Sequence, residues 1–336
     1  GLLGPASHSN EAQLRAGGEA SLLPCSLAPL LSCYLLTAHR SSVCRFSLQS
    51  ASSSITSIMA ASTETTDPVP QVKFALITIA IAAIPSLAWW VSKQSKGTDW
   101  LYKAAWVGAF IVNLITVSIP GRFDGRAETT VDGKVTIPWK SLFEPSGWAF
   151  AIWGVIYASE LLVTAYVGVI GQPSAVLTRA APFWLMGNLF QSLWCFAFRK
   201  EFASILWLPM SLLALGAASL GLAHNELTVA IDALSDTFST GAKWRLLLLR
   251  LPLALHTGWL SAASLLNLNA WMSVSRFPLD RQITTAFLSA YLGAALGAGL
   301  SVRSGDPFIA FTVAWALAAL ADRTLQKVKE TPALVS

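Results

Sequence analysis

Two ionisable side chains lie inside long apolar stretches of the sequence. Glu160 lies in the stretch 148–169 and His256 in the stretch 246–272. A charge is costly in such surroundings unless it is paired, neutralised by a proton or exposed to water. If the two stretches face each other, Glu160 and His256 can share one proton and offer a ligand both a donor and an acceptor, and ligand binding should then change between about pH 5 and 8. The alternative is that each side chain hydrogen-bonds a neighbouring helix.

Aromatic side chains occupy the same stretches. Helical offsets of three, four and seven residues place Trp153, Tyr157 and Glu160 on one face. Tryptophans inside a helix bundle either pack its core or form the walls of a pocket for a flat apolar ligand. Tryptophans near the ends of spans, such as Trp100 and Trp106, are explained by an aromatic belt at the membrane surface. The interior tryptophans are therefore the candidates for a pocket, with core packing as the alternative.

Long helices must position these residues, and the sequence predicts such helices. Hydrophobic residues make up 54% of the chain and charged residues 12%, with a mean hydropathy of +0.56, which is typical of a multi-pass membrane protein. Apolar runs of roughly the 17 to 25 residues that cross a bilayer recur along the chain. These runs are 74–91, 104–120, 148–169, 180–198, 202–223, 246–272, 283–302 and 307–321. We predict an all-α polytopic membrane helix bundle of about eight spans. The second and eighth runs are short, so a half-span or a strong tilt is open for each, and seven spans is the alternative.

The formal net charge of +5 comes from basic residues that are scattered singly through the connections between spans. This scatter excludes a nucleic-acid-binding face and indicates charges that flank a membrane. Lysine and arginine are more frequent in the connections on one side, which places the loop 121–145 and the C-terminus on the cytoplasmic or equivalent side. We expect this loop to fold over the mouth of the bundle.

The two ends of the chain differ from the helical membrane domain, which we place at 73–325. Residues 1–72 are rich in Ser, Ala and Leu and contain few acidic residues, as in a transit peptide for a plastid or a mitochondrion. Because Met59 resembles an ordinary start, the residues before it could instead be a leader without a role. Residues 326–336 form a C-terminal tail.

No familiar motif for catalysis or metal binding occurs in the apolar part of the chain. It has no phosphate-binding loop, no HExxH or GxSxG sequence and no paired CxxC. The cysteine spacing matches neither a zinc site nor a disulfide framework. We therefore expect neither catalytic residues nor a metal.

Two longer motifs carry a resemblance to a known family. The first, PSGWAFAIWGVIY, begins at Pro145, and the second comprises Leu251-Pro252, Gly258-Trp259, Ala263 and Asn267. Further similar positions are Asn113 before Pro120-Gly121, and Asn188 before Trp194. These residues resemble the tryptophan-rich sensory protein family, that is, the TspO/MBR or translocator-protein superfamily, in its long bacterial branch. The resemblance covers about 104–275 and implies a five-helix core around a pocket for flat hydrophobic ligands, which in the family include porphyrins and, in the animal branch, sterols.

The sequence departs from the family pattern at positions that bear on the ligand. His256 stands where the family has a Tyr, and Glu160 has no counterpart in the family. The sterol-recognition pattern is present only in a Trp version, formed by Leu268, Trp271 and Arg276. We therefore do not expect sterol binding.

The residue pattern and the resemblance together predict a ligand site between the third and sixth spans. Its candidate ligand-binding residues are Trp148, Phe150, Trp153, Tyr157, Glu160, Asn188, Trp194, His256, Trp259 and Asn267. We expect an integral membrane protein, not an enzyme, that binds a porphyrin or another tetrapyrrole without an obligatory cofactor. Its expected role is regulation or stress response.

The expected partners are membrane lipid and a hydrophobic small molecule, and not nucleic acid. Gly293 and Gly297 form a GxxxG pattern, which serves either close packing within the chain or a homodimer. Two other functions remain open. In a secondary transporter, Glu160 would be the proton-linked residue, and in an accessory subunit of a photosynthetic membrane complex, His256 would hold a pigment.

Overall fold

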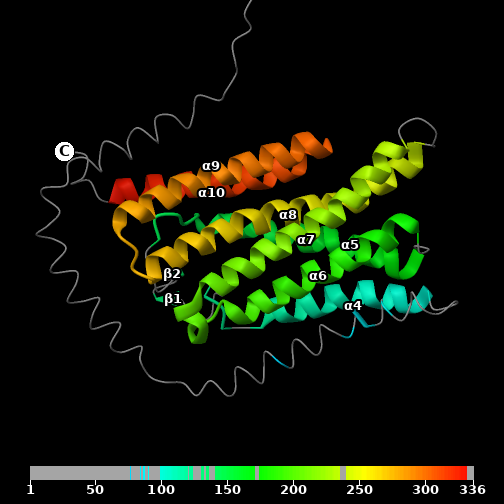
Figure 1. Ribbon diagram of the computed structural model, residues 1–336, viewed down its shortest axis with the longest axis horizontal. Helices are drawn as coiled ribbons and strands as arrows, with labels where there is room; N and C mark the ends of the chain where they lie inside the picture. The colour runs from blue at the N-terminus through cyan, green and yellow to red at the C-terminus, as the bar shows by residue number, and fades with distance from the viewer. Residues whose placement is uncertain are drawn as a thin grey trace, which may run out of the picture. The chain divides into compact units, whose positions relative to one another are not determined.

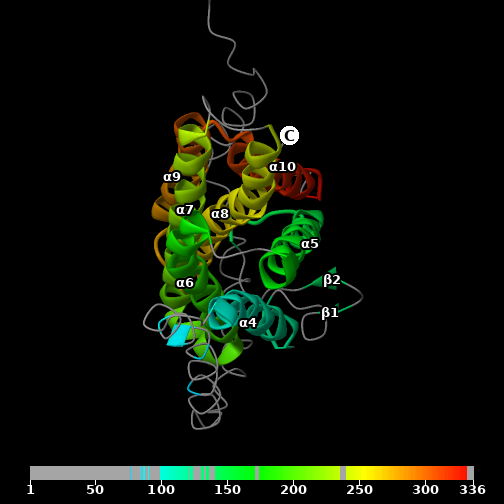
Figure 2. The same cartoon turned by 90° about the vertical axis from the view of Figure 1, so that its right-hand side faces the viewer.

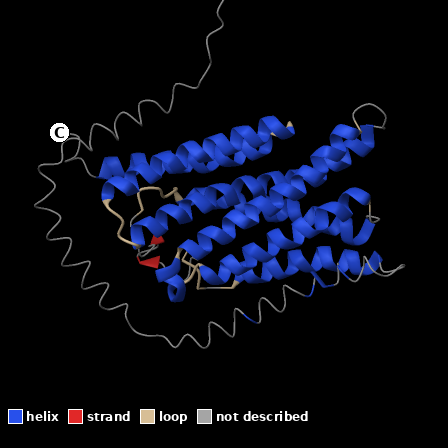
Figure 3. Cartoon of the chain, in the orientation of Figure 1, coloured by secondary structure: helices blue, strands red, loops and turns tan. Residues whose placement is uncertain are grey.

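The computed structural model describes residues 99–119, 121–123, 130–131, 134–135, 141–170, 174–234 and 240–330, with a few single positions between 76 and 90. In this part of the chain seven α-helices follow one another (Figure 1): α4 (Asp99–Ser118), α5 (Ile152–Ala165), α6 (Ala175–Ala197), α7 (Trp207–Ala233), α8 (Thr240–Val274), α9 (Leu279–Ser304) and α10 (Pro307–Glu330). The 3-10 helices η1 (Gly147–Ala151) and η3 (Lys200–Ile205) precede α5 and α7, and the π-helical turn η2 (Tyr166–Ile170) follows α5. Two short antiparallel strands, β1 (Thr130–Val131) and β2 (Lys134–Val135), lie outside the helices (Figure 3). The predicted all-α class is confirmed.

Six helical segments in the described residues are long and apolar enough to cross a membrane: Trp100–Ser118, Gly147–Val169, Trp207–Ala233, Lys243–Val274, Leu279–Ser304 and Pro307–Lys329. Helix α6 is not among them, and it carries Arg179, Asn188 and Gln191 between its apolar residues. It nevertheless has 23 residues, or about 35 Å of helix, and packs between α4 and α7. The chain is therefore an integral multi-pass membrane protein.

The predicted spans agree with the helices from residue 104 onward, whereas the run 74–91 lies outside the described residues. Helices α4 and α10, for which a half-span was open, have 20 and 24 residues, enough for a full crossing. Helix α10 continues past residue 325, where we placed the start of the tail, and ends at Glu330.

The helices α4 to α8 form the predicted five-helix arrangement, and α9 and α10 add a hairpin to it. Helix α7 lies between α6 and α8, and α4 packs against α6 (Figure 1). Helix α5 contacts both α4 and α8 (Figure 2). Both helices of the hairpin pack against α8.

Small residues allow the hairpin to approach its neighbours closely. A Cβ atom at Gly258 would lie 2.9 Å from the carbonyl oxygen of Ile309, so a side chain there would collide with the backbone of α10. The GxxxG pattern packs within the chain, because Gly293 and Gly297 both face Val313 of α10.

The core contains a tryptophan that we assigned to the membrane surface. Trp106 is only 2% exposed and stacks on Trp184, with ring centroids 5.1 Å apart and planes 8° apart. The aromatic-belt interpretation is therefore wrong for Trp106, because this residue faces α6 rather than lipid. Trp100, which is 64% exposed, agrees with that interpretation.

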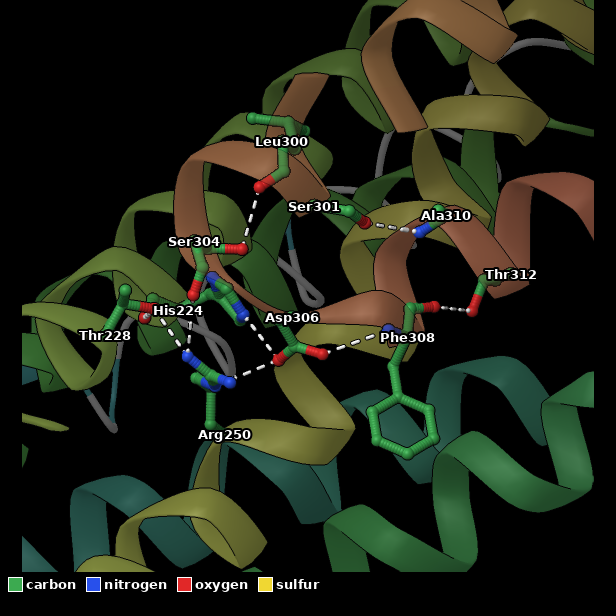
Figure 4. Close-up of polar contacts among 10 residues, drawn as sticks. All are labelled: His224, Thr228, Arg250, Leu300, Ser301, Ser304, Asp306, Phe308, Ala310 and Thr312. Carbon is green, nitrogen blue, oxygen red and sulfur yellow. Dashed lines mark hydrogen bonds and ion pairs between the residues drawn. The ribbon is translucent and has the colours of Figure 1, made fainter. Parts of the chain in front are cut away.

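A buried group of charged residues fixes the turn of the hairpin to α7 and α8 (Figure 4). The left-handed conformation of Gly305, with a φ of 61°, ends α9. Asp306 then begins α10, because its Oδ1 atom accepts the backbone N–H of Phe308 at 3.0 Å. The Oδ2 atom of Asp306 lies 3.0 Å from Nε2 of His224 on α7 and 2.9 Å from Nε of Arg250 on α8.

These contacts keep Asp306 ionised. Burial raises the pKa of its carboxyl group, but the hydrogen bonds from His224 and from the backbone of Phe308, together with the charge of Arg250, lower the pKa more. The pKa of Asp306 is therefore below its ordinary value of 3.8. A carboxylate at this position ties both α7 and α8 to the start of α10.

Candidate ligand-binding site

Residues 141–149, here called the mouth segment, lead into α5 and lie against the C-terminal half of α10. The backbone N–H of Ser146 donates to the carbonyl oxygen of Ala319 at 2.9 Å. The hydroxyl group of Ser146 and the indole N–H of Trp148 both donate to Oδ2 of Asp322, at 2.7 and 2.9 Å. The mouth segment is therefore held along one side by backbone and side-chain hydrogen bonds.

Two further residues of α10 hold the two ends of the mouth segment. Nζ of Lys327 lies 2.7 Å from Oε2 of Glu144 and donates to the carbonyl oxygen of Ser141 at 3.2 Å. The indole N–H of Trp315 donates to the carbonyl oxygen of Ala149 at 2.9 Å. The mouth segment and the C-terminal end of α10 therefore lie at the same end of the bundle, and the side of the membrane that this end faces stays a prediction.

A cavity with a volume of about 70 Å³ lies beneath the mouth segment, between α5, α6 and α8. Its walls include five of the predicted residues: Phe150, Trp153, Trp194, Trp259 and Asn267. The rings of Trp153 and Phe150 each meet Trp259 edge-on, with centroid distances of 5.9 and 5.8 Å. A cavity with aromatic walls therefore lies where the pocket between the third and sixth spans was predicted, and its binding of a ligand stays a prediction.

Other lining residues were missed by the sequence analysis. Phe198 stacks on Trp194 with a centroid distance of 5.3 Å, and its position one helical turn after Trp194 is a signal that could have revealed it. Phe143 also lines the cavity and lies two residues before the first family motif. Leu213 of α7 lines the cavity too, but nothing in its sequence surroundings marks it.

Trp148 does not line the cavity. Its ring is 42% exposed and meets the ring of Trp315 edge-on at 4.8 Å, and its N–H is bonded to Asp322. Trp148 therefore attaches the mouth segment to α10 rather than forming a wall of the predicted pocket.

Tyr157 and Asn188 lie in a buried polar network instead of in the cavity wall. The side-chain amide of Asn113 on α4 donates to Oδ1 of Asn188 at 3.0 Å and to Oε1 of Gln191 at 2.7 Å. The hydroxyl group of Tyr157 donates to Oδ1 of Asn113 at 3.2 Å and accepts from Gln191 at 2.8 Å. The network joins α4, α5 and α6 by interhelical hydrogen bonds.

Glu160 and His256 are brought into contact, as expected for facing helices. Nδ1 of His256 lies 2.6 Å from Oε1 of Glu160, and both side chains are 0% exposed. Among the described residues, Oε2 of Glu160 and Nε2 of His256 have no hydrogen-bond partner. The pair does not line the cavity, but Trp153, which does, meets the ring of His256 edge-on at 5.6 Å.

The described residues offer aromatic surfaces rather than a metal site. No group of three or more His, Cys, Asp or Glu side chains in the described ranges could hold a metal ion. The aromatic walls can instead contact a planar organic ring by stacking or by edge-to-face packing.

Comparison with known proteins extends the resemblance beyond the five-helix core. The searches among curated proteins and among solved structures gave no match. A family model described as TSPO-like protein matches residues 99–335, which include α9 and α10 as well as the stretch 104–275 that carries the family motifs. Because this match covers most of the chain, the protein belongs to the TSPO-like family of the TspO/MBR superfamily.

Proposed function

We propose that this TSPO-like membrane protein binds a flat hydrophobic ligand of the tetrapyrrole class in the cavity beneath the mouth segment. One observation carries the proposal. The aromatic side chains of Phe150, Trp153, Trp194 and Trp259 come from three helical segments that are far apart in the sequence, and they line one cavity. The protein then acts in regulation or stress response through the bound ligand, without catalysing a reaction.

Ligand entry requires the mouth segment to move. The cavity volume of about 70 Å³ is well below the roughly 300 Å³ at the lower end of small-molecule sites. The ion pair between Glu144 and Lys327 is partly exposed, so water can replace it at little cost. We therefore expect the ligand to enter between the mouth segment and the ends of α5, α6 and α8.

Titration with protoporphyrin IX tests the site. The protein is reconstituted in lipid nanodiscs, and binding is followed by the absorbance change of the porphyrin, which does not depend on the number of tryptophans. Trp153→Leu and Trp259→Leu should each weaken binding about fivefold or more, because an aromatic contact contributes about 1 kcal/mol beyond the buried area. Trp100→Leu, at an exposed position of α4, is the matched control and should bind like the unaltered protein.

Unchanged porphyrin affinity in both cavity variants, with native helix content by circular dichroism, would remove the ligand site from this cavity. No binding to the unaltered protein would contradict the tetrapyrrole class itself.

Proton-linked transport is a second candidate function, and the buried contact between Glu160 and His256 favours it. In proteoliposomes, a transporter would couple substrate uptake to a change of internal pH, and Glu160→Gln would abolish the coupling. Porphyrin binding without any proton movement would favour the binding protein.

We also propose an organelle membrane as the location, on the composition of residues 1–72. A fluorescent protein fused to the C-terminus and imaged in cells tests this. Fluorescence confined to the cell surface would contradict it.

A further inference from the structure

Three polar atoms of residues that line the cavity have no hydrogen-bond partner among the described residues. They are the indole nitrogens of Trp194 and Trp259, which are donors, and the side-chain oxygen of Asn267, which is an acceptor. All three side chains are buried. The amide nitrogen of Asn267 already donates to the carbonyl oxygen of Ala263 at 2.9 Å, so only its oxygen is left for another molecule.

Three other indoles of the bundle find acceptors within the protein, whereas the buried indole nitrogen of Trp106, outside the cavity, also has no partner among the described residues. Trp184 donates to the carbonyl oxygen of Trp106, Trp315 donates to a carbonyl oxygen of the mouth segment, and Trp148 donates to a carboxylate. Leaving a buried N–H or C=O without a partner costs about as much free energy as losing a hydrogen bond. Unpartnered buried atoms also occur elsewhere, for example at Tyr102 and Thr164, but two donors and one acceptor gather on residues that line one apolar cavity, which favours a shared partner there.

On the basis of the proposed function, we propose that the ligand has a flat apolar body with a polar edge, formed by a carbonyl oxygen together with an O–H or N–H group. The carbonyl oxygen accepts from Trp194 and Trp259, and the O–H or N–H donates to Asn267. The aromatic walls recognise the flat body, and these three atoms select among flat molecules by their peripheral groups. A flat hydrocarbon without such groups leaves all three atoms unpaired and binds less tightly.

Three porphyrins with the same ring test this selection. Protoporphyrin IX carries carboxyl groups, its dimethyl ester carries carbonyl oxygens without the acidic O–H, and etioporphyrin carries neither. In nanodiscs at a pH low enough to protonate the carboxyl groups, we expect the free acid to bind most tightly, the ester about threefold to tenfold more weakly, and etioporphyrin weaker again by a similar factor.

Asn267→Leu identifies the acceptor. In this variant the preference for the free acid over the ester should disappear, while the preference for the ester over etioporphyrin remains. Leu266→Ala, which alters an apolar part of the wall, should weaken all three porphyrins by a similar factor. The empty Asn267→Leu protein should be at least as resistant to thermal unfolding as the unaltered protein, because it loses an unpaired buried oxygen. If Asn267 had a purely structural role, the Asn267→Leu protein would instead unfold at a lower temperature than the unaltered protein.

The outcomes separate the two proposals. Equal affinity for all three porphyrins would overturn the polar edge and leave the cavity as the binding site. An unchanged order of affinities in Asn267→Leu would overturn the role of Asn267. If none of the three porphyrins bound, both the tetrapyrrole proposal and the polar edge that rests on it would fail.

Discussion

Replacing Asp306 with alanine should destabilise the bundle by about 3–5 kcal/mol, because the substitution leaves the buried guanidinium group of Arg250 without its counter-charge. The structure provides a comparison that isolates burial as the cause. Arg250 and Asp306 are 2.9 Å apart with side chains 7% and 2% exposed, whereas Arg179 and Glu226 are 2.8 Å apart with side chains 52% and 27% exposed. The distances are nearly equal, so the two pairs differ mainly in burial. Because the pair of Arg179 and Glu226 is exposed to water, it should contribute only about 0–1 kcal/mol to the free energy of unfolding.

The two contributions of Asp306 can be separated with a second variant. Asp306→Asn removes the charge but keeps an oxygen that can accept the backbone N–H of Phe308 at the start of α10. It should therefore be less destabilised than Asp306→Ala by about 1 kcal/mol, the usual contribution of a helix N-cap. The free energy of unfolding is measured by titrating the protein in mild detergent with sodium dodecyl sulfate and following helix content by circular dichroism. Equal losses in Asp306→Ala and Glu226→Gln would refute the reasoning.

The destabilisation caused by Asp306→Ala should depend on pH. The folded-state pKa of Asp306 is below the ordinary value of 3.8, so the stability that its charge contributes is fully present above about pH 3.8 and is lost as the pH falls through the folded-state pKa. The difference in unfolding free energy between the unaltered protein and Asp306→Ala should therefore stay constant from pH 7 down to about 4 and shrink below that.

Three further predictions concern the neighbourhood of the cavity. Gly258→Ala should cost about 1–3 kcal/mol of unfolding free energy, because its Cβ meets the backbone of α10, and unchanged stability would mean that the helices are not in this close contact. Glu160→Gln and His256→Phe should each weaken porphyrin binding, because His256 contacts the ring of Trp153 in the cavity wall, with a combined effect smaller than the sum, and strictly additive losses would show that the two residues act separately. Lys327→Met should accelerate porphyrin association in stopped-flow measurements by removing the contact with Glu144, and an unchanged rate would show that the mouth segment does not limit entry.

The helical membrane architecture could be predicted because it depends on local properties of the chain. An apolar run must be long enough to cross the hydrocarbon core, and its backbone must satisfy its own hydrogen bonds, so length and hydropathy are sufficient to place the six helices other than α6. The walls formed by Phe150, Trp153 and Trp259 could be predicted in the same way, because helical spacing and the family motifs mark them. The contact between Glu160 and His256 was one of two alternatives that the sequence left open, since each ionisable group needed some partner in apolar surroundings, and the structure shows that they contact each other.

Other features depended on which helices pack against each other, and the sequence of one helix does not specify its neighbour. Trp106 has the position of a membrane-surface tryptophan but is buried because α6 covers it. The hydrogen bonds from Ser146 and Trp148 to Asp322 join residues far apart in the chain.

The sequence by itself therefore determined the class of the protein, its apolar spans and some of the aromatic residues that face the interior, such as Trp153 and Trp259. Only the tertiary structure decided which of the predicted residues line one cavity, and that α10 holds its mouth segment through contacts such as that between Lys327 and Glu144. The physical reason is that hydropathy and helical period fix the side of a helix that avoids lipid, whereas the partner on that side is chosen by packing between distant segments.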